Sequence, residues 1–403
     1  MNLMPKQNNI LMLAFELPPH NSGGLGVACL GMTKALVKKG FNITFMLPKK
    51  LVYPHTHMKI IFSDDFDNTS NCSTSSIYSN QKQQNLYTRG YMLEYLNPTF
   101  DAQIENFTQS MVEASKKQDF SIIHVHDWMT FEAGIKIKEL TDKPLIVHIH
   151  STELDRSPEF AMDIRKYEIE KKGMHFADAV VVVSNYTKRI VNKYYNVPLN
   201  KIVVMYNAAD VDLSYKSLYP VNLNNPLVVF LGRITHQKGP YFLLEAAKKT
   251  IKKDPKAIFV IVGNGDMYES MIEKACNYGL TGNIIFTNFL RGVFRDSLLK
   301  RADVFVMPSL SEPFGIVALE AAYFDTPIIV SKQSGVGEVL RSSIKVDFWD
   351  TDLLSKKIYE LLRKRHLRKS LVDKHKRELK NITWETTTES LAYLYKKLMS
   401  KHI

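Results

Sequence analysis

The sequence predicts an α/β protein made of two successive domains, each a doubly wound parallel sheet covered by helices. Short β-branched runs alternate with amphipathic stretches of helical length almost from end to end, which is the pattern of parallel sheets. The chain has 403 residues, enough for two hydrophobic cores of ordinary size. The alternation is interrupted near the middle by a stretch rich in Asn and Pro, which predicts a linker.

The expected strands form two series. Those of the first are ILMLAF, NITFML, SIIHVH, PLIVHIH, AVVVVS and KIVVMY, and those of the second are LVVFLG, AIFVIVG, NIIFTNF, VFVMP and PIIVS. Segments such as GMTKALVKKG and FLLEAAKKTIKK are the helices between them. Ligands of doubly wound sheets bind beyond the carboxyl ends of the strands, so functional residues are expected there.

The two series set the domain boundaries. We expect a Rossmann-like N-terminal domain over residues 1–208, a linker over 209–226 and a Rossmann-like C-terminal domain over 227–382. Residues 66–84 are rich in Ser, Asn and Gln and cannot contribute to a core. We expect them to form a mobile surface loop.

The composition is that of a folded cytoplasmic protein. Hydrophobic residues at 45% and charged residues at 23% exclude a fibrous or disordered chain. No apolar run approaches the roughly 18 residues of a spanning helix, so neither a membrane span nor a signal peptide is expected. The three cysteines are far apart and have neither disulfide nor zinc-site spacing, which fits a reducing cytoplasm.

The net charge of +12 is concentrated near the C-terminus, where Lys356–Lys380 holds eleven Lys and Arg against three acidic residues. Leucines at helical spacing run through this stretch, so one interpretation is packed helices with a solvated basic face. The other is a peripheral contact with a polyanion or with a membrane, at its cytoplasmic (inner) face. No nucleic-acid partner is expected.

Glycines follow the first expected strand. Gly23, Gly24 and Gly26 precede a helix, where backbone N–H groups can approach an anion such as a phosphate. The pattern is not GxGxxG, because Cys29 stands where the third glycine would fall, and it lacks the GK[ST] of a P-loop. A plain tight turn is the alternative.

Histidines end two neighbouring strands of the first series. His124 and His126 share one strand face, as do His148 and His150. A metal site would need both strands to converge and a carboxylate ligand besides, so we expect no metal. Structural and functional roles both remain open for each histidine.

The first strand of the second series leads into the loop GRITHQKG. Its Arg233 and Lys238 are two cations five residues apart at the carboxyl end of a strand. Together they can clamp a diphosphate, and solvated surface cations are the alternative.

The strand VFVMP leads to SLSEPFGIVALEAAYF. Pro313 and Gly315 break the strand, and a helix is expected from about Phe314 onward. The amides of Gly315, Ile316 and Val317 then lie in its first turn, where they can bind an anion.

Two carboxylates flank this helix start. Glu312 precedes the helix and Glu320 lies one to two turns inside it, so both can reach a ligand at the helix terminus. Carboxylates accept hydrogen bonds from the vicinal hydroxyls of sugars and ribose. The alternative is a charge that complements the helix dipole together with a solvated glutamate.

The order of these motifs resembles the GT-B glycosyltransferases, in particular family 4 and its bacterial and archaeal glycogen and starch synthase relatives. The resemblance covers nearly the whole chain and is carried by SGGLG, HDW, the HST strand end, VSNYTKRI, GRITHQKG, VGNGD, SEPFGIVALEAA and PIIVSKQSGVGEVL. It implies two Rossmann-like domains facing across a cleft, with a helix over residues 383–403 packing back on the N-terminal domain.

The resemblance also implies residue roles. Gly23 and Gly24 lie beside the donor diphosphate, and Arg233 and Lys238 stabilise it together with the backbone from Phe314 to Val317. The other implied roles are ribose binding for Glu320, contact with the transferred sugar for Glu312 and with the reacting sugar for His150, and acceptor contact for Asp127.

The implied reaction retains the anomeric configuration and needs no metal and no cofactor. No paired carboxylates of the glycosidase kind are evident, so electrostatic stabilisation of the leaving diphosphate is expected. The segment Asp65-Phe-Asp67 mimics the DxD metal motif of another glycosyltransferase fold, but it lies beside the polar insertion and not at a strand end.

The resemblance favours glucose transfer from UDP- or ADP-glucose to the end of an α-glucan. Glucan synthases usually carry a lysine in the first loop, KxGGL, whereas Asn21 and Ser22 precede the glycines here. Mannosyl or other hexosyl transfer to a lipid, as in a glycolipid, or to a small-molecule acceptor therefore stays open.

Functions from other classes also remain. A nucleotide-sugar epimerase could share this architecture, and so could a non-catalytic carbohydrate- or membrane-binding module. A dehydrogenase would need the third glycine that this sequence lacks.

Overall fold

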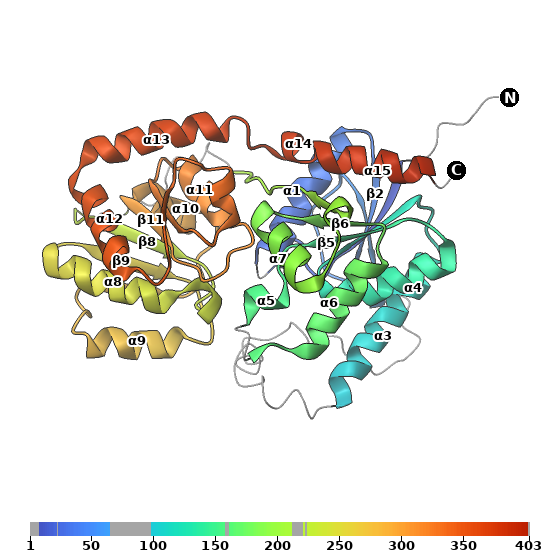
Figure 1. The fold of residues 1–403 in the computed structure, drawn as a ribbon, viewed down its shortest axis with the longest axis horizontal. Helices are drawn as coiled ribbons and strands as arrows, with labels where there is room; N and C mark the ends of the chain where they lie inside the picture. The colour runs from blue at the N-terminus through green and yellow to red at the C-terminus, as the bar shows by residue number, and fades with distance from the viewer. Residues whose placement is uncertain are drawn as a thin grey trace. The chain divides into compact units, whose positions relative to one another are not determined.

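The computed structural model describes residues 8–21, 23–64, 98–157, 161–211, 221 and 224–401. The chain forms two compact units, each built on one parallel sheet (Figure 1). The first unit comprises Met1–Leu154, Pro158–Asn207 and Trp384–Ile403, and the second comprises Asp155–Ser157 and Ala208–Thr383. Both sheets are Rossmann-like, as the alternating sequence pattern predicts.

The first unit holds a seven-stranded parallel sheet of order β3-β2-β1-β4-β5-β6-β7. Its strands are β1 Asn9–Leu13, β2 Asn42–Leu47, β3 Lys59–Phe62, β4 Ile122–His126, β5 Leu145–Ile149, β6 Ala179–Val182 and β7 Ile202–Val204. The central strands are buried along their whole length because helices cover both faces. The register sets His126 beside His148, so the histidines of β4 and β5 meet at one sheet edge.

The helices of the first unit are α1 Gly24–Lys38, α3 Pro98–Ser115, α4 Phe131–Thr141, α6 Ile164–Phe176, α7 Asn185–Tyr195, α14 Trp384–Thr387 and α15 Glu389–Lys401, and α5 Glu153–Arg156 holds residues of both units. Side chains cap α6 and α7. Asp163 accepts from the first-turn amides of α6, and Ser184 accepts from the amide of Thr187 in α7.

The second unit holds a six-stranded parallel sheet of order β10-β9-β8-β11-β12-β13. Its strands are β8 Leu227–Leu231, β9 Ile258–Val262, β10 Ile284–Thr287, β11 Val304–Met307, β12 Ile328–Ser331 and β13 Ile344–Val346. Its helices are η7 His236–Lys238, α8 Pro240–Lys253, α9 Tyr268–Asn277, α10 Gly292–Arg301, α11 Ile316–Tyr323, η8 Gly335–Glu338, α12 Thr351–Arg363 and α13 Arg365–Leu379.

The C-terminal segment returns to the first unit, as expected for residues 383–403. Trp384 packs so closely on α1 that a Cβ added at Gly31 would lie 2.1 Å from its ring. Tyr395 of α15 is fully buried, and its hydroxyl forms a 2.6 Å hydrogen bond with Nδ1 of His124. Ring contacts with Phe41 and His124 hold the same tyrosine.

Some predictions fall outside the described residues. These are the loop at 66–84, the Asp65-Phe-Asp67 segment and most of the linker at 209–226. Within the part of the chain that the structure describes, no helix is long and apolar enough to cross a membrane.

Candidate active site

The predicted site residues form two groups at the carboxyl ends of strands, one group in each unit. Arg233, Lys238, Glu312 and the start of α11 belong to the second unit. The residues of the first unit are Gly23, Gly24, Asp127 and His150. Each group is described within its own unit.

The loop after β8 is fixed in place by its neighbours in the second unit. The amide of Ile234 donates to the carbonyl of Asn264, and the chain then forms the short helix η7. Gly239 follows with φ +67, and a Cβ there would lie 2.1 Å from the carbonyl oxygen of Pro308. Only glycine allows this approach of loop to strand end, and the approach brings Lys238 to the end of β11.

Lys238 and Glu312 form a largely buried ion pair. The distance from Nζ to Oε2 is 2.6 Å, and the two side chains are 19% and 7% exposed. Ser309 donates a second hydrogen bond to the same oxygen, at 3.1 Å. The backbone of Glu312 is also bound on both sides, by the carbonyl of Gln333 and the amide of Gly335. The carboxylate is therefore held in one position.

Arg233 is exposed and has a buried supporting residue, Gln237. The Oε1 atom of Gln237 accepts from Nη2 of Arg233 at 3.4 Å, and its Nε2 atom donates to the carbonyl of Ser311 at 3.1 Å. Gln237 thus joins the loop after β8 to the segment that precedes α11. Two cations, one exposed and one paired, stand at the same end of the sheet.

The helix α11 begins at Ile316, two residues later than expected, because Gly315 adopts a left-handed conformation with φ +104. A Cβ at Gly315 would lie 2.6 Å from the Cε atom of Met307, so glycine is required here. Phe314 is buried, and its carbonyl accepts from the amide of Val336 at 2.7 Å. Any contact of Phe314 with a ligand must therefore come from its backbone.

Glu320 lies on α11 and is paired with Arg295 of α10. Nη1 of Arg295 donates to Oε1 of Glu320 at 3.1 Å, and the same guanidinium binds Asp296 at 2.7 Å. Burial raises the pKa of Glu320, while the charge of Arg295 acts in the opposite direction. The sequence alone did not identify Arg295, because the segment RDSL matches no motif that predicts an ion pair with another helix.

In the first unit, Asp127 holds the backbone around His150. It has φ +57, and its Oδ1 atom accepts from the amides of His150 and Ser151 at 2.7 and 3.4 Å. The acceptor contact expected for Asp127 remains a prediction. Through these two hydrogen bonds the Asp127 carboxylate also fixes the loop that carries His150.

Four imidazoles cluster where β4 and β5 end. Nδ1 of His126 and Nε2 of His150 are 3.0 Å apart, and the rings of His148 and His150 stack with centroids 4.3 Å apart. Burial lowers the pKa of His124 to about 3 and that of His150 to about 3. Burial, with the neighbouring imidazoles, lowers the pKa values of His126 and His148 as well. The cluster is therefore neutral at physiological pH.

The glycines of the first unit precede α1. Gly23 is the N-cap residue and Gly24 the first helical residue. The amide of Gly26 donates to Oε1 of Glu16 at 3.1 Å, so a carboxylate of the chain already lies at this helix terminus. Glu16 was not singled out from the sequence, since nothing in AFEL distinguishes it.

Two family models match consecutive parts of the chain. Residues 22–213 match Glycosyltransferase Family 4, and residues 216–378 match Glycosyl transferases group 1. An uncharacterized glycosyltransferase of Methanocaldococcus jannaschii is 27% identical over 97% of this chain and 98% of its own length. The glycogen synthase of Mycobacterium tuberculosis is 25% identical over 82% of this chain and 80% of its own length.

A solved structure shares the fold. The catalytic domain of starch synthase IV from Arabidopsis thaliana, bound to ADP and acarbose, superposes with a TM-score of 0.71 at 15% identity. The match covers 98% of this chain and 99% of that domain.

Proposed function

This chain belongs to the GT-B glycosyltransferases of family 4, and we propose that it transfers a hexosyl group from a nucleotide-sugar to a glycan acceptor with retention of configuration. The observation that carries this proposal is the ion pair of Lys238 and Glu312 beside the N-terminus of α11. It joins a cation suited to a diphosphate with a carboxylate suited to sugar hydroxyls.

The proposed mechanism is electrostatic. As the glycosyl bond breaks, negative charge develops on the departing diphosphate. Lys238 and the exposed Arg233 stabilise this charge, and the first-turn amides of α11, from Gly315 to Val317, add their dipoles. The departing phosphate oxygen takes the proton of the acceptor hydroxyl. In this scheme no metal and no cofactor take part.

Glu320 accepts hydrogen bonds from the ribose hydroxyls of the donor in this scheme. Arg295 counteracts the effect of burial on the pKa of this carboxyl group and fixes its direction, since the guanidinium donates to one oxygen. Glu312 contacts the transferred sugar while Lys238 and Ser309 hold it.

Gly23, Gly24, His150 and Asp127 serve the reacting end of the substrates in the proposed scheme. Gly23 and Gly24 lie beside the diphosphate at the start of α1. His150 is a neutral imidazole, so it binds the reacting sugar through hydrogen bonds and carries no charge. Asp127 contacts the acceptor and fixes the backbone of His150.

We propose glucose as the transferred sugar, from UDP- or ADP-glucose to the end of an α-glucan. Support comes from the glycogen synthase relative and from the starch synthase that holds ADP. Asn21 and Ser22, in place of a lysine-bearing first loop, keep mannosyl or other hexosyl transfer to a lipid or small molecule as the alternative.

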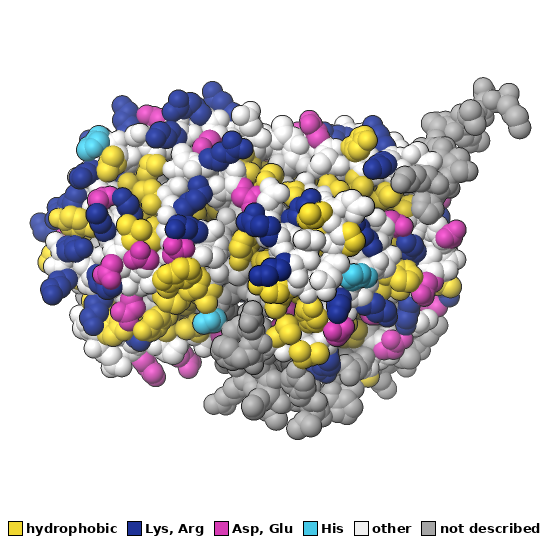
Figure 2. All heavy atoms as spheres, viewed as in Figure 1, with side chains coloured by type: hydrophobic (Ala, Val, Ile, Leu, Met, Phe, Trp, Pro, Cys, Tyr) yellow, Lys and Arg dark blue, Asp and Glu magenta, His cyan; other side chains and the backbone are white. Residues whose placement is uncertain are grey.

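A peripheral contact with an anionic membrane surface is the partner that suits a lipid acceptor. Lys and Arg side chains gather over α13 in Figure 2. Lys364, Arg365 and Lys369 are exposed there. Lys300, Arg365 and Lys369 line a groove of about 370 Å³. Each such cation contributes on the order of 1 kcal/mol near an anionic bilayer.

A donor screen tests the proposed function. UDP-, ADP- and GDP-linked hexoses are offered with and without maltooligosaccharide, and nucleotide diphosphate release is followed. Release that depends on acceptor supports transfer. An epimerised free donor without acceptor identifies an epimerase, and tight sugar binding without turnover identifies a binding module.

A further inference from the structure

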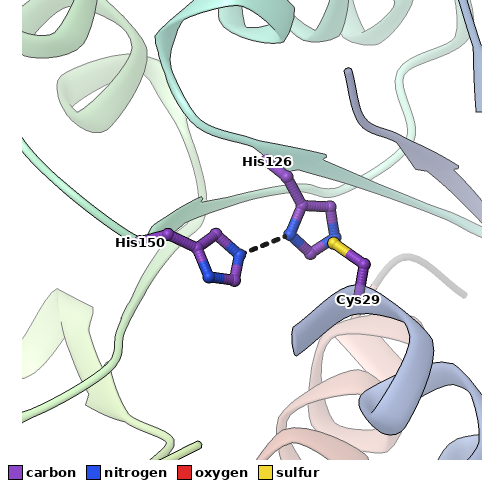
Figure 3. A group of neighbouring side chains, drawn as sticks. All are labelled: Cys29, His126 and His150. Atoms are coloured by element: carbon purple, nitrogen blue, oxygen red, sulfur yellow. Dashed lines mark hydrogen bonds between the residues drawn. The ribbon is translucent and has the colours of Figure 1, made fainter. Parts of the chain in front are cut away.

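Three side chains from distant parts of the sequence converge in the first unit. Cys29 projects from α1, His126 ends β4 and His150 follows β5 (Figure 3). One ligating atom from each lies within 4.8 Å of the other two. Cys29 and His126 are fully buried, whereas His150 is partly exposed.

The ring nitrogens around this trio are poorly satisfied. Nε2 of His124, Nε2 of His126 and both nitrogens of His148 are buried without a hydrogen-bond partner among the described residues. The rings contact one another in stacked or tilted pairs. Each unsatisfied buried group costs about 1–3 kcal/mol, whereas the nitrogens that face each other within the trio, Nδ1 of His126 and Nε2 of His150, are paired with one another.

We propose that Cys29, His126 and His150 bind one Zn²⁺ ion. One thiolate and two imidazoles are a donor set that zinc prefers, and the fourth position stays open for water on the partly exposed side of His150. The two imidazole nitrogens are 3.0 Å apart. Tetrahedral zinc with bonds of about 2.0–2.1 Å needs about 3.3 Å between them, a small adjustment.

Burial raises the pKa of the Cys29 thiol well above its usual value, and the negative charges of Asp127 and Glu16 raise it further. The same two carboxylates favour a cation over an uncompensated thiolate at this place. On binding, the thiol loses its proton to solvent, and the thiolate sulfur donates an electron pair to zinc. The hydrogen bond between His126 and His150 is replaced by two nitrogen–metal bonds, with the remaining imidazole protons on the other nitrogens. No redox partner is required.

The bound ion occupies His150 and therefore inhibits transfer. This consequence rests on the proposed function, because it assumes that His150 contacts the reacting sugar. Metal binding itself does not rest on that assumption. Zinc is thus a reversible inhibitor of this chain and takes no part in its chemistry.

Titration of the full-length, chelator-treated chain with Co²⁺ and then Zn²⁺ tests the site. We expect one Co²⁺ per chain, with a thiolate-to-cobalt charge-transfer band that Zn²⁺ abolishes. Cys29→Ala should lose the band and weaken binding more than about 100-fold, beyond the usual effect of an outer-shell change. Cys276→Ala, at an exposed cysteine, should retain both.

Binding that is absent from the natural chain, or unchanged in a Cys29→Ala variant with natural thermal stability, overturns the site. Cys29→Ser repeats the measurement if the alanine variant unfolds. Zinc should inhibit transfer by the natural chain, a chelator should restore it, and Cys29→Ala should transfer in the presence of zinc. Binding without inhibition refutes the role of His150, whereas transfer without binding refutes the zinc site alone.

Discussion

Replacing Lys238 by methionine has two separable effects. Methionine keeps much of the volume of the side chain and removes its charge, so Glu312 is left with Ser309 as its remaining side-chain donor among the described residues. Breaking a buried pair from one side costs about 3–5 kcal/mol of stability. Because Lys238 is 19% exposed, we expect a value at the lower end, about 3 kcal/mol.

The catalytic effect comes from the same charge. Loss of one donor to a developing oxyanion lowers kcat by about 100-fold or more, which corresponds to about 2.7 kcal/mol of transition-state stabilisation. Arg233→Ala should lower kcat by a similar factor. Because Arg233 is exposed and weakly paired, its loss should change stability by less than about 1 kcal/mol.

Urea unfolding gives the stability, and turnover at saturating donor gives kcat. The matched control is Lys332→Met, which removes a lysine from a 2.7 Å pair with Asp347 in which the lysine is 56% exposed. Lys332→Met should lower the free energy of unfolding by less than about 1 kcal/mol and leave kcat unchanged. The double variant Lys238→Met with Glu312→Gln should regain part of the stability and none of the activity. Near-normal kcat in Lys238→Met would refute the assignment of Lys238 to the diphosphate.

Three further predictions follow from other contacts. Arg295→Met removes the positive charge that counteracts the effect of burial on the pKa of Glu320. As the pH is lowered, Glu320 should become protonated, and donor affinity should fall, at a higher pH than in the natural chain. Calorimetric donor titrations from neutral to mildly acidic pH measure this, and an unchanged pH dependence contradicts it. Gly31→Ala places a Cβ 2.1 Å from the ring of Trp384 and should cost about 1–3 kcal/mol in thermal unfolding. When Trp384 is replaced by alanine, Gly31→Ala should lower the free energy of unfolding by less than it does in the natural chain. Equal losses in the two backgrounds would argue against this packing. Replacing Lys364, Arg365 and Lys369 by Glu should weaken sedimentation with phosphatidylglycerol vesicles by more than about 100-fold, at about 1 kcal/mol per residue. The same charge change at Lys248, Lys252 and Lys253 of α8 should have a smaller effect, and equal losses would show that net charge alone is responsible.

Most of the fold was predictable because its signals are local: the expected short apolar runs match strands of both sheets, and the loop motifs follow the carboxyl ends of those strands. The edge strands β3 and β13 were not expected, because each is short and only partly buried. The basic stretch Lys356–Lys380, expected to form one or two helices, lies in α12 and α13. The packing of α15 on the first unit was expected from the family resemblance alone, since no sequence pattern in the last helix predicts which residues it contacts.

The structure shows which of the expected site residues contact one another, and these contacts could not be expected from the sequence. Lys238 and Glu312 were expected near one ligand, but their direct pairing depends on Gly239 approaching Pro308 across 69 residues of sequence (308 minus 239). Arg295 pairs with Glu320 from a different helix, and Glu16 reaches Gly26 from before the glycine loop. Such partners are set by packing of remote segments, which periodicity and motif spacing do not encode.

The histidine cluster illustrates the same limit. The sequence placed His124, His126, His148 and His150 at two strand ends and gave no reason to include Cys29. The sheet register and the position of α1 supply that reason, because they bring the thiol to the imidazoles.

Transfer of a sugar from a nucleotide-sugar with retention is tested most directly by proton NMR of the products when UDP- or ADP-glucose is supplied with maltooligosaccharide, with Lys238→Met in parallel. We expect acceptor-dependent release of nucleotide diphosphate and a new α-linkage, with a loss of about 100-fold in the variant. A β-linked product, or no diphosphate release from any donor in the screen, would contradict it.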